Sequence, residues 1–406
     1  MTGKLMEFLE ELSRALIASG NSVTETERIL RSIAGSLGVM VEVSVLPTML
    51  IIKMGGDVSR MSLAAQSPGF IPLHQVTEIY RLIDDVKEGC VDPESALDKL
   101  VSIKRSPHRS GRLGMFSGYI LLSVGIAFLI QPDLSLITYS SFLSLIAGFL
   151  IVMSYGNERL SLIMPVLASF TVSSVAFFMI GEGLMTGNLS LLVPPLIYFI
   201  PGVTITTGMY ELASQELVSG SSRVIYACML LLLLLFGVLM GMQLNGFPQQ
   251  EFTAIKITSS FIYSPYLGAV LFAAGIYLFL SVRRSDFPWI LLVLYTALLG
   301  QQIGNLIGGG LLGAFLGALS MTVTARGIEI AGKTSHFVTL YPAFWFLAPG
   351  SIGFIGLANL IGKNYLTSIA EIGLFAMTVV AIALGLLVGA LLTEPLHEKN
   401  RAPSGD

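Results

Sequence analysis

Residues 194–212 read PPLIYFIPGVTITTGMYEL, and residues 342–360 read PAFWFLAPGSIGFIGLANL. Both stretches place a proline seven residues before a Pro-Gly pair and continue with a glycine and a leucine at the same spacing, so every matched residue is offset by 148. Proline and glycine are common in membrane helices. A spacing shared over this many positions nevertheless indicates an internal repeat.

Further matches extend the repeat upstream of both stretches. The same offset relates Gly156-Asn157 to Gly304-Asn305, and Gly125-Ile126 matches Gly275-Ile276 with a slip of two residues. A row of small residues also corresponds to a row of glycines that would let a neighbouring helix approach closely. This row pairs Ser161, Pro165 and Ser169 with Gly309, Gly313 and Gly317.

The composition places the repeat in a membrane. Charged residues make up 12% of the chain, against roughly 25% in soluble domains, which excludes a single soluble domain. Residues 1–110 carry 26 charged side chains, whereas residues 113–392 carry 17. The sequence therefore predicts a soluble N-terminal domain and a polytopic membrane domain with ten apolar segments, most of them near the ~20 residues that a membrane helix needs. The predicted spans are residues 113–131, 134–153, 160–181, 188–210, 222–243, 264–282, 287–303, 305–325, 335–358 and 367–392.

Residues 1–110 are predicted to form a small α+β layer structure. Ser22 and Glu25 form a capping box at the start of a helix, and Gly38 suits the end of that helix. The expected helices cover residues 5–16, 22–38, 74–87 and the stretch from 92, and the expected strands cover residues 41–46, 49–54 and 58–63.

Positive charges orient the membrane domain. With the N-terminal domain in the cytoplasm, twelve Lys and Arg residues fall inside and only Lys256 and Lys363 fall outside, as the positive-inside rule requires. Each copy of the repeat holds five spans, and because five is odd the second copy is predicted to be inverted. Inverted repeats are typical of secondary transporters that alternate access to a midplane site. The predicted domains are a cytoplasmic α+β domain over 1–110, five-helix repeats over 111–250 and 251–395, and a cytoplasmic tail over 396–406.

The Pro-Gly pairs predict two discontinuous helices. Pro201 and Pro349 lack a backbone N–H, and such breaks occur at membrane depth only inside protein or beside a cavity. The half-helix that starts at each break presents free N–H groups and a positive dipole end, which suit a substrate carboxylate. Nearby hydroxyl and amide groups are expected to bind the rest of the substrate, although hydrogen bonding between helices is an equal alternative for the two asparagines beside Gly156 and Gly304. The predicted substrate-binding residues are Pro201, Gly202, Thr204, Thr207, Pro349, Gly350, Ser351, Asn157, Asn305 and Asn359.

Two acidic residues, Glu211 and Glu158, are the candidates for proton coupling. Glu211 lies one turn after Thr207 on the same helix face. A carboxyl group in a low-dielectric site keeps its proton more readily and can exchange it near neutral pH. The alternative is that both acids are hydrated helix ends, paired with Arg159 or Arg223. No catalytic residue, metal site or cofactor is predicted, since the two cysteines form no motif.

The sequence resembles the threonine/serine exporter family. The resemblance rests on residues 18–28 (ASGNSVTETER), 46–52 (LPTMLII) and 72–76 (PLHQV), on the ten spans and on the paired Pro-Gly breaks, and it covers nearly the whole chain. It implies two fused five-span halves that export small hydroxy amino acids with the proton gradient. The expected partners are then a small amino acid, protons and the lipid of the cytoplasmic (inner) membrane, and a homo-oligomer stays open.

Dicarboxylate export is a second hypothesis, because some relatives of that family, in two-chain form, are associated with it. A dicarboxylate needs more positive charge than the predicted site offers. The nearby cations are Arg159, Arg223, Arg326 and Lys333.

Two further hypotheses come from other functional classes. A membrane-anchored hydrolase would act through Ser59, Asp57 and His74, but the sequence holds no GxSxG, P-loop or HExxH motif. A channel would be excluded by saturable, gradient-driven accumulation. A net charge of −3 gives no indication of nucleic acid binding.

Overall fold

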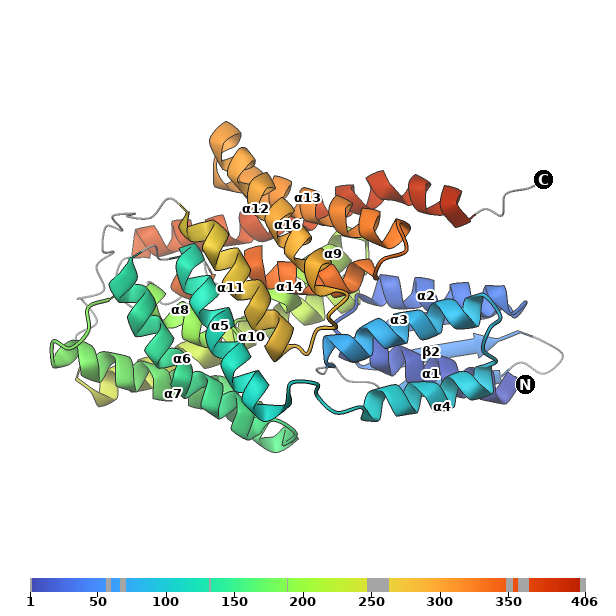
Figure 1. The fold of residues 1–406 in the computed structure, drawn as a ribbon, viewed down its shortest axis with the longest axis horizontal. Coiled ribbons are helices and arrows are strands. Elements are labelled where there is room, and N and C mark those ends of the chain that lie inside the picture. Colours follow the sequence, from blue (N-terminus) through green and yellow to red (C-terminus); the bar gives the residue numbers. More distant parts are fainter. Residues whose placement is uncertain are drawn as a thin grey trace.

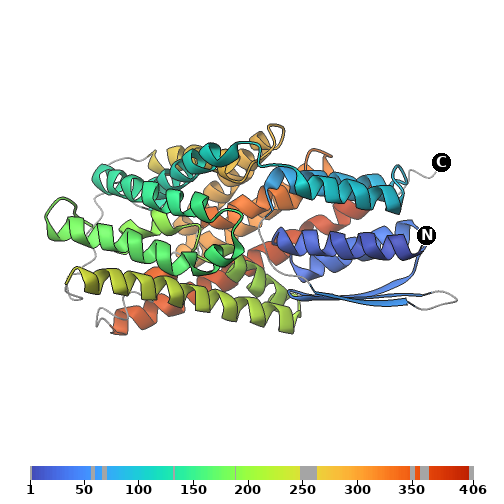
Figure 2. The ribbon, with the colours of Figure 1, turned by 90° about the horizontal axis from the view of Figure 1, so that it is seen from below.

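Helices make up most of the computed structural model of the chain, which describes residues 2–55, 60–65, 71–130, 133–187, 189–246, 263–347, 353–356 and 365–401. The elements of residues 2–105, here called the N-terminal segment, lie at one end of the long axis of the molecule. The helices of residues 111–401 fill the rest (Figure 1, Figure 2).

The N-terminal segment packs four helices against a three-stranded antiparallel sheet with the order β1-β2-β3. Alternate strand residues such as Val43, Val45 and Ile52 are buried, whereas Leu63 on the other face is exposed. The sheet therefore covers one side of the helices, which Figure 2 shows edge-on. The elements are α1 (Thr2–Ala18), α2 (Val23–Ser36), β1 (Val41–Leu46), β2 (Met49–Met54), β3 (Arg60–Ala65), α3 (Leu73–Lys87) and α4 (Pro93–Arg105).

Local chemistry explains the ends of these elements. The Ser22 hydroxyl accepts a hydrogen bond of 3.2 Å from the backbone N–H of Glu25, as the capping box predicts. Gly38 follows α2 with a φ of +70°, the left-handed conformation expected at its end. The third strand continues to Ala65, two residues beyond the predicted end, because its register with β2 pairs Ala65 with Met49. Residues 58 and 59 of the predicted strand lie outside the described residues.

Seven helices of the described residues are long and apolar enough to cross a membrane. Their outer faces expose large apolar side chains such as Phe149, Leu232 and Phe236, a surface that lipid stabilises and water does not. The chain is a multi-pass membrane protein. The helices are α5 (Gly111–Ile130), α6 (Leu134–Ser154), α7 (Glu158–Gly181), α10 (Leu217–Leu244), α12 (Phe287–Gly308), α13 (Gly310–Ile330) and residues Ile369–Glu394 of α16 (Tyr365–Arg401). A shorter apolar helix, α11, covers Ser264–Phe279.

The first Pro-Gly pair interrupts its helix as predicted. A 3-10 turn (Leu189–Leu192) and α8 (Val193–Leu196) precede the break, and α9 (Gly202–Ala213) starts after it with Pro201 as the N-cap. The corresponding stretch in the second copy begins with α14 (His336–Leu347). The predicted break at Pro349-Gly350 lies outside the described residues.

Glycines bring α5 and α11 into close antiparallel contact. A Cβ atom added at Gly125 would lie 2.8 Å from the carbonyl oxygen of Gly268, and one added at Gly118 would lie 3.0 Å from that of Gly275. Each helix therefore inserts two glycines, seven residues apart, against the backbone of the other. Adding 150 to a residue number in α5 gives its counterpart in α11. With this offset Gly118 corresponds to Gly268 and Gly125 to Gly275, so each of the two contacts maps onto the other.

A second pair of contacts recurs between the two copies. Gly237 and Gly241 of α10 pack against residues Val166, Ser169 and Ser173 of α7. In the same way, Gly385 and Gly389 of α16 pack against Phe315, Ala318 and Thr322 of α13.

These contacts correct the predicted alignment of α7 with α13. They relate Ser169 to Ala318, an offset of 149, rather than to Gly317. Asn157 and Asn305 do not correspond either, because Asn157 is the N-cap of α7 whereas Asn305 lies inside α12, which continues to Gly308. Gly313 does act as a packing residue, since an added Cβ would lie 2.8 Å from the side-chain Cγ of Asn305.

The N-terminal segment is anchored to the loop between α11 and α12. Backbone N–H groups of Leu73 and His74 donate to the carbonyl oxygens of Leu280 and Ser281 at 2.8 and 3.1 Å. Deeper in this contact, the hydroxyl of Thr77 donates to the buried carboxylate of Asp286 at 2.8 Å. His74 is thus a buried residue of an interface, and its Nε2 lies 3.3 Å from the hydroxyl of Ser106. Ser59 and Asp57, the other residues of the hydrolase hypothesis, lie outside the described residues.

Candidate functional site

A cavity of about 80 Å³ lies where the N-terminal segment meets α9 and the helices α13, α14 and α16. Allowing 10–15 Å³ for each water-sized group, it holds roughly five to eight of them. We call it the junction cavity. The N-terminal segment contributes Gly20, Asn21, Ser22 and Glu25 to its lining. The polar residues from the helices are Thr207 and Tyr210 of α9, Thr322 and Arg326 of α13, and His336 of α14.

Glu211 of α9 holds the loop between α1 and α2 against the helices. Its Oε1 accepts a hydrogen bond of 2.9 Å from the backbone N–H of Val23, the first residue of α2. Its Oε2 lies 3.0 Å from Nε of Arg223 on α10, and the Glu211 side chain is completely buried. The carboxylate therefore meets a guanidinium and the positive end of the α2 dipole at the same time.

Arg223 and Tyr80 bind the same loop from two sides. Nη2 of Arg223 donates to the carbonyl oxygen of Asn21 at 3.1 Å, and the hydroxyl of Tyr80 donates to Oδ1 of Asn21 at 2.9 Å. Because Arg223 belongs to α10 and Tyr80 to α3, the loop between α1 and α2 is bound both by the helices of residues 111–401 and by the N-terminal segment.

Gly20 fits the loop against α14. Its φ of +95° favours glycine, and a Cβ atom there would lie 3.0 Å from the ring of Tyr341. Tyr341 is tilted against Phe337, whose ring stacks with that of Tyr80 at 6.4 Å. Residues 20–22 are thus enclosed between α9 and α10 on one side and α14 on the other.

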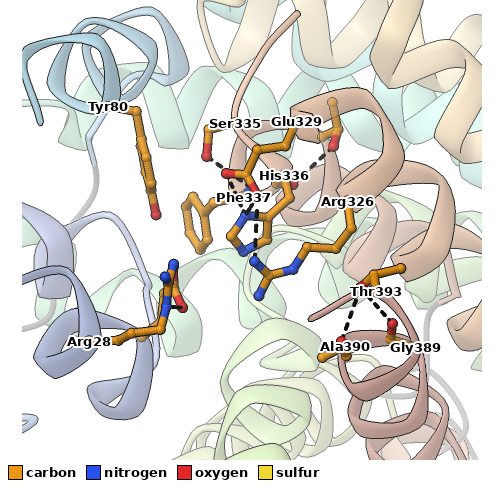
Figure 3. Close-up of polar contacts among 12 residues, drawn as sticks. Arg28, Tyr80, Arg326, Glu329, Ser335, His336, Phe337, Gly389, Ala390 and Thr393 are labelled. Atoms are coloured by element: carbon orange, nitrogen blue, oxygen red, sulfur yellow. Dashed lines mark hydrogen bonds and ion pairs between the residues drawn. The ribbon is translucent and has the colours of Figure 1, made fainter. Parts of the chain in front are cut away.

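Charged pairs surround the junction cavity. Glu25 accepts two hydrogen bonds from Arg28, at 2.8 and 2.6 Å. Across the cavity, Glu329 lies 2.9 Å from Nδ1 of His336 and 3.5 Å from Nη1 of Arg326. Figure 3 shows Arg28 and Tyr80 on one side of this group and His336, Glu329 and Arg326 on the other.

The Glu25 carboxylate is ionised at neutral pH. Burial alone would raise its pKa, but the hydrogen bonds and charge of Arg28, with smaller contributions from His336 and Arg326, lower the pKa to about 2. The junction cavity therefore has a carboxylate on α2 and a guanidinium on α13.

A second cavity, of about 300 Å³, lies beside the first. Its lining includes Arg28, Tyr80 and Glu329, the bonded partners or neighbours of residues that line the junction cavity. The pairs Glu25–Arg28 and His336–Glu329 thus form a shared wall between the two cavities. Within the described parts of the chain, no three His, Cys, Asp or Glu side chains gather as a metal site requires.

Residues 7–245 match the sequence profile of a family described as "Putative threonine/serine exporter". The match covers more than half of the chain and includes the N-terminal segment and the helices through α10. The chain belongs to the threonine/serine exporter family. The description of the family is that of a transporter, and the resemblance seen in the sequence is confirmed over residues 7–245.

One curated relative of this exporter family member is a protein of Schizosaccharomyces pombe, "Uncharacterized protein C16A10.01". It is 25% identical over 214 residues, which cover 47% of this chain and 26% of the relative. The match thus spans about a quarter of the relative's length. No solved structure matches the exporter chain.

Few of the predicted substrate-binding residues line the junction cavity. Thr207 does, whereas Pro201 and Gly202 are buried at the start of α9 and Thr204 is half-buried there. Asn157 is exposed and caps α7 by accepting from the N–H of Leu160 at 3.2 Å. Asn305 and Glu158 are also exposed. Outside the described residues lie Pro349, Gly350, Ser351 and Asn359.

Sequence reasoning missed most of the residues that line the cavity. Glu25 was recognised only as part of a capping box, and Arg326 only as one of four cations near the predicted site. His336 begins α14 and gave no separate signal. One signal was available, because residues 18–28 carry part of the family resemblance and residues 20–22 and Glu25 of that stretch line the cavity.

Proposed function

We propose that this protein exports threonine and serine from the cytoplasm by alternating access, coupled to the proton gradient. Membership of the exporter family supports the transport class and the hydroxy amino acid substrate. In this proposal the protein lies in the cytoplasmic membrane, with residues 1–110 and the C-terminal tail on the cytoplasmic side, as the distribution of Lys and Arg indicates.

The glycine contacts support two inverted five-helix repeats. The contact of Gly125 with Gly268 and that of Gly118 with Gly275 are mates under the offset of 150, so the α5–α11 interface is related to itself by a pseudo-two-fold axis. Later residues of α5 contact earlier residues of α11. These two corresponding helices therefore run in opposite directions. Mates that cross a membrane in opposite directions belong to inverted repeats. The recurrence of the α7–α10 contacts between α13 and α16 extends the same relation.

The junction cavity is the observation that carries the proposal. It lies between α9 of the first copy and α13, α14 and α16 of the second, and a rocking-repeat transporter keeps its substrate at the interface between its repeats. Because residues 20–22 and Glu25 line it, the cavity is at the cytoplasmic end of that interface in this proposal. Its hydroxyl groups, Thr207 and Thr322, suit a substrate hydroxyl, and Arg326 suits a carboxylate. Its volume matches the roughly eight non-hydrogen atoms of threonine.

Glu211 is our candidate for proton coupling. Its carboxylate accepts a hydrogen bond from Val23 and forms an ion pair with Arg223 while the N-terminal segment is docked. When the loop leaves, the carboxylate loses the Val23 N–H, so uptake of a proton becomes more favourable. Glu158 remains a second, weaker candidate because it is exposed at the start of α7.

Reconstituted vesicles test the proposal. Vesicles that hold only this protein are loaded with labelled amino acids or dicarboxylates and given a proton gradient. We expect saturable, gradient-dependent transport of threonine and serine, and Glu211→Gln should abolish or uncouple it. Transport of dicarboxylates alone, or proton-coupled transport of threonine by Glu211→Gln at the wild-type rate, would contradict the respective part of the proposal.

A further inference from the structure

The N-terminal segment completes the junction cavity rather than lying apart from it. Asn21, Ser22 and Glu25 line the cavity together with residues of the four helices α9, α13, α14 and α16. The Glu211 carboxylate and the Arg223 guanidinium hold the backbone of this loop in place. A substrate in the cavity therefore contacts a wall supplied by residues outside the membrane helices.

The charges of the cavity match those of a zwitterion. At neutral pH an α-amino acid carries a carboxylate and an ammonium group on the same carbon atom. The cavity has the Arg326 guanidinium on α13 and the Glu25 carboxylate on α2. Both remain ionised at neutral pH, since Arg side chains do not lose their proton and Arg28 lowers the pKa of Glu25 to about 2.

Glu25 has capacity to bind a further donor. The ion pair with Arg28 uses one hydrogen bond on each oxygen, at 2.8 and 2.6 Å. A carboxylate has about four acceptor positions, and within the described part of the chain the Arg28 hydrogen bonds fill two of them. The position of the side chain is fixed, because Glu25 is in the first turn of α2 and its own N–H is held by Ser22 at 3.2 Å.

We propose that Glu25 binds the ammonium group of the transported amino acid, so that the N-terminal segment selects amino acids over hydroxy acids that lack this group. Arg326 binds the carboxylate at the opposite side of the cavity. The inference rests on the proposed function and assigns a specificity-determining role to a residue of the N-terminal segment.

The test compares threonine with 3-hydroxybutyrate, which is threonine without its amino group. The measurements are the KM for threonine in reconstituted vesicles and the inhibition constant of 3-hydroxybutyrate against labelled threonine. Glu25→Gln keeps the size of the side chain and removes its charge. We expect the KM for threonine to rise about tenfold or more, the loss of one charge-assisted hydrogen bond, while the inhibition constant of 3-hydroxybutyrate stays the same or falls.

Two further variants separate recognition from structure. Arg28→Lys keeps a cation beside Glu25, so the carboxylate stays ionised, but it removes the planar guanidinium that holds both oxygens. It should keep the preference for threonine. Glu42→Gln removes an exposed carboxylate, paired with Lys53 on the sheet, and should change neither constant. If Glu25→Gln does not reach the membrane, Glu25→Asp replaces it, and the shorter acid should raise the KM for threonine alone.

The outcomes separate the inference from the proposed function. If wild-type vesicles transport threonine but Glu25→Gln leaves the preference unchanged, the inference is wrong and the exporter function stands. The inference is also wrong if Arg28→Lys loses the preference to the same extent, since Glu25 then acts only through its hydrogen-bonded pair with Arg28. If wild-type vesicles do not transport threonine, the proposed function fails and the inference fails with it.

Discussion

The carboxylate of Glu211 accepts a hydrogen bond of 2.9 Å from the backbone N–H of Val23, 188 residues earlier in the chain. One acidic side chain of a membrane-domain helix thus serves as a cap for the first turn of a helix in the N-terminal segment. Because α2 also carries Glu25 into the junction cavity, the position of the proposed substrate site depends on this contact.

Replacing Glu211 by alanine should destabilise the protein more than replacing it by glutamine. Alanine leaves the buried guanidinium of Arg223 without its ion partner, which costs about 3–5 kcal/mol, whereas glutamine still accepts from the Val23 N–H. We expect the midpoint of thermal unfolding in detergent to follow the order wild type, Glu211→Gln, Glu211→Ala. Adding Arg223→Met to Glu211→Ala should restore part of the loss. Equal midpoints for all four proteins would mean that the pair does not stabilise the docked segment.

Gly20 and Gly38 form a matched pair for testing how the loop is packed. Both have positive φ angles, +95° and +70°, but a Cβ at Gly20 meets Tyr341 at 3.0 Å and one at Gly38 meets nothing within 4 Å. Gly38→Ala should therefore cost only the backbone strain, about 1–2 kcal/mol, and Gly20→Ala should cost more. Denaturation of the two variants measures the difference, and Tyr341→Leu should reduce the cost at Gly20 but not at Gly38.

Patterns that depend on neighbouring residues were predicted well. The capping box at Ser22, the left-handed Gly38 and the break at Pro201 depend on backbone chemistry within a few residues. The apolar spans depend on hydropathy over about 20 residues. Each of these signals is complete in the local sequence, so no knowledge of packing was needed.

The junction cavity could not be predicted in this way. Glu25 and His336 are far apart in the chain, and both had ordinary local interpretations. They lie close together because α2 docks on α9 and α14, and the hydrophobic periodicity of a single helix does not indicate such a contact. The predicted alignment of Asn157 with Asn305 was wrong for a related reason. Because α12 continues past Asn305 to Gly308, Asn305 lies inside a helix and not in the turn that precedes α13.

The α5–α11 interface offers a direct test of the pseudo-two-fold relation. Gly125→Leu and Gly275→Leu insert side chains at mated positions, where even a Cβ would lie 2.5 Å from the backbone nitrogen of Phe272 or 2.5 Å from the Cα atom of Leu122. Both variants should lose a similar stability, about 1–3 kcal/mol or more, and both should lose threonine transport. Gly373→Leu, in a region of α16 with nothing within 4 Å of an added Cβ, is the control. Strong loss at only one mated glycine would argue against a symmetric interface.

Arg326 should be sensitive even to a change that keeps its charge. Arg326→Lys retains a cation but loses the planar fork that binds both oxygens of a carboxylate. We expect the KM for threonine to rise about tenfold in Arg326→Lys and further in Arg326→Gln, with Arg284→Lys, an exposed conservative change, as the control. A threonine KM that Arg326→Gln leaves unaltered would remove this residue from carboxylate binding.

The ion pair of Glu25 predicts a pH dependence of stability. Its pKa is lowered from 4.5 to about 2 in the folded protein by Arg28, so the stabilisation is fully present above about pH 4.5 and is lost as the pH falls toward 2. The difference in unfolding midpoint between wild type and Glu25→Gln should therefore be constant from pH 7 to about pH 5 and shrink below that. Glu42→Gln, which removes the exposed acid on the sheet, gives the baseline for general effects of acid. If the midpoint of wild type instead rose relative to that of Glu25→Gln on acidification, the pKa of Glu25 would be raised in the folded protein. The ionised carboxylate would then destabilise the folded protein.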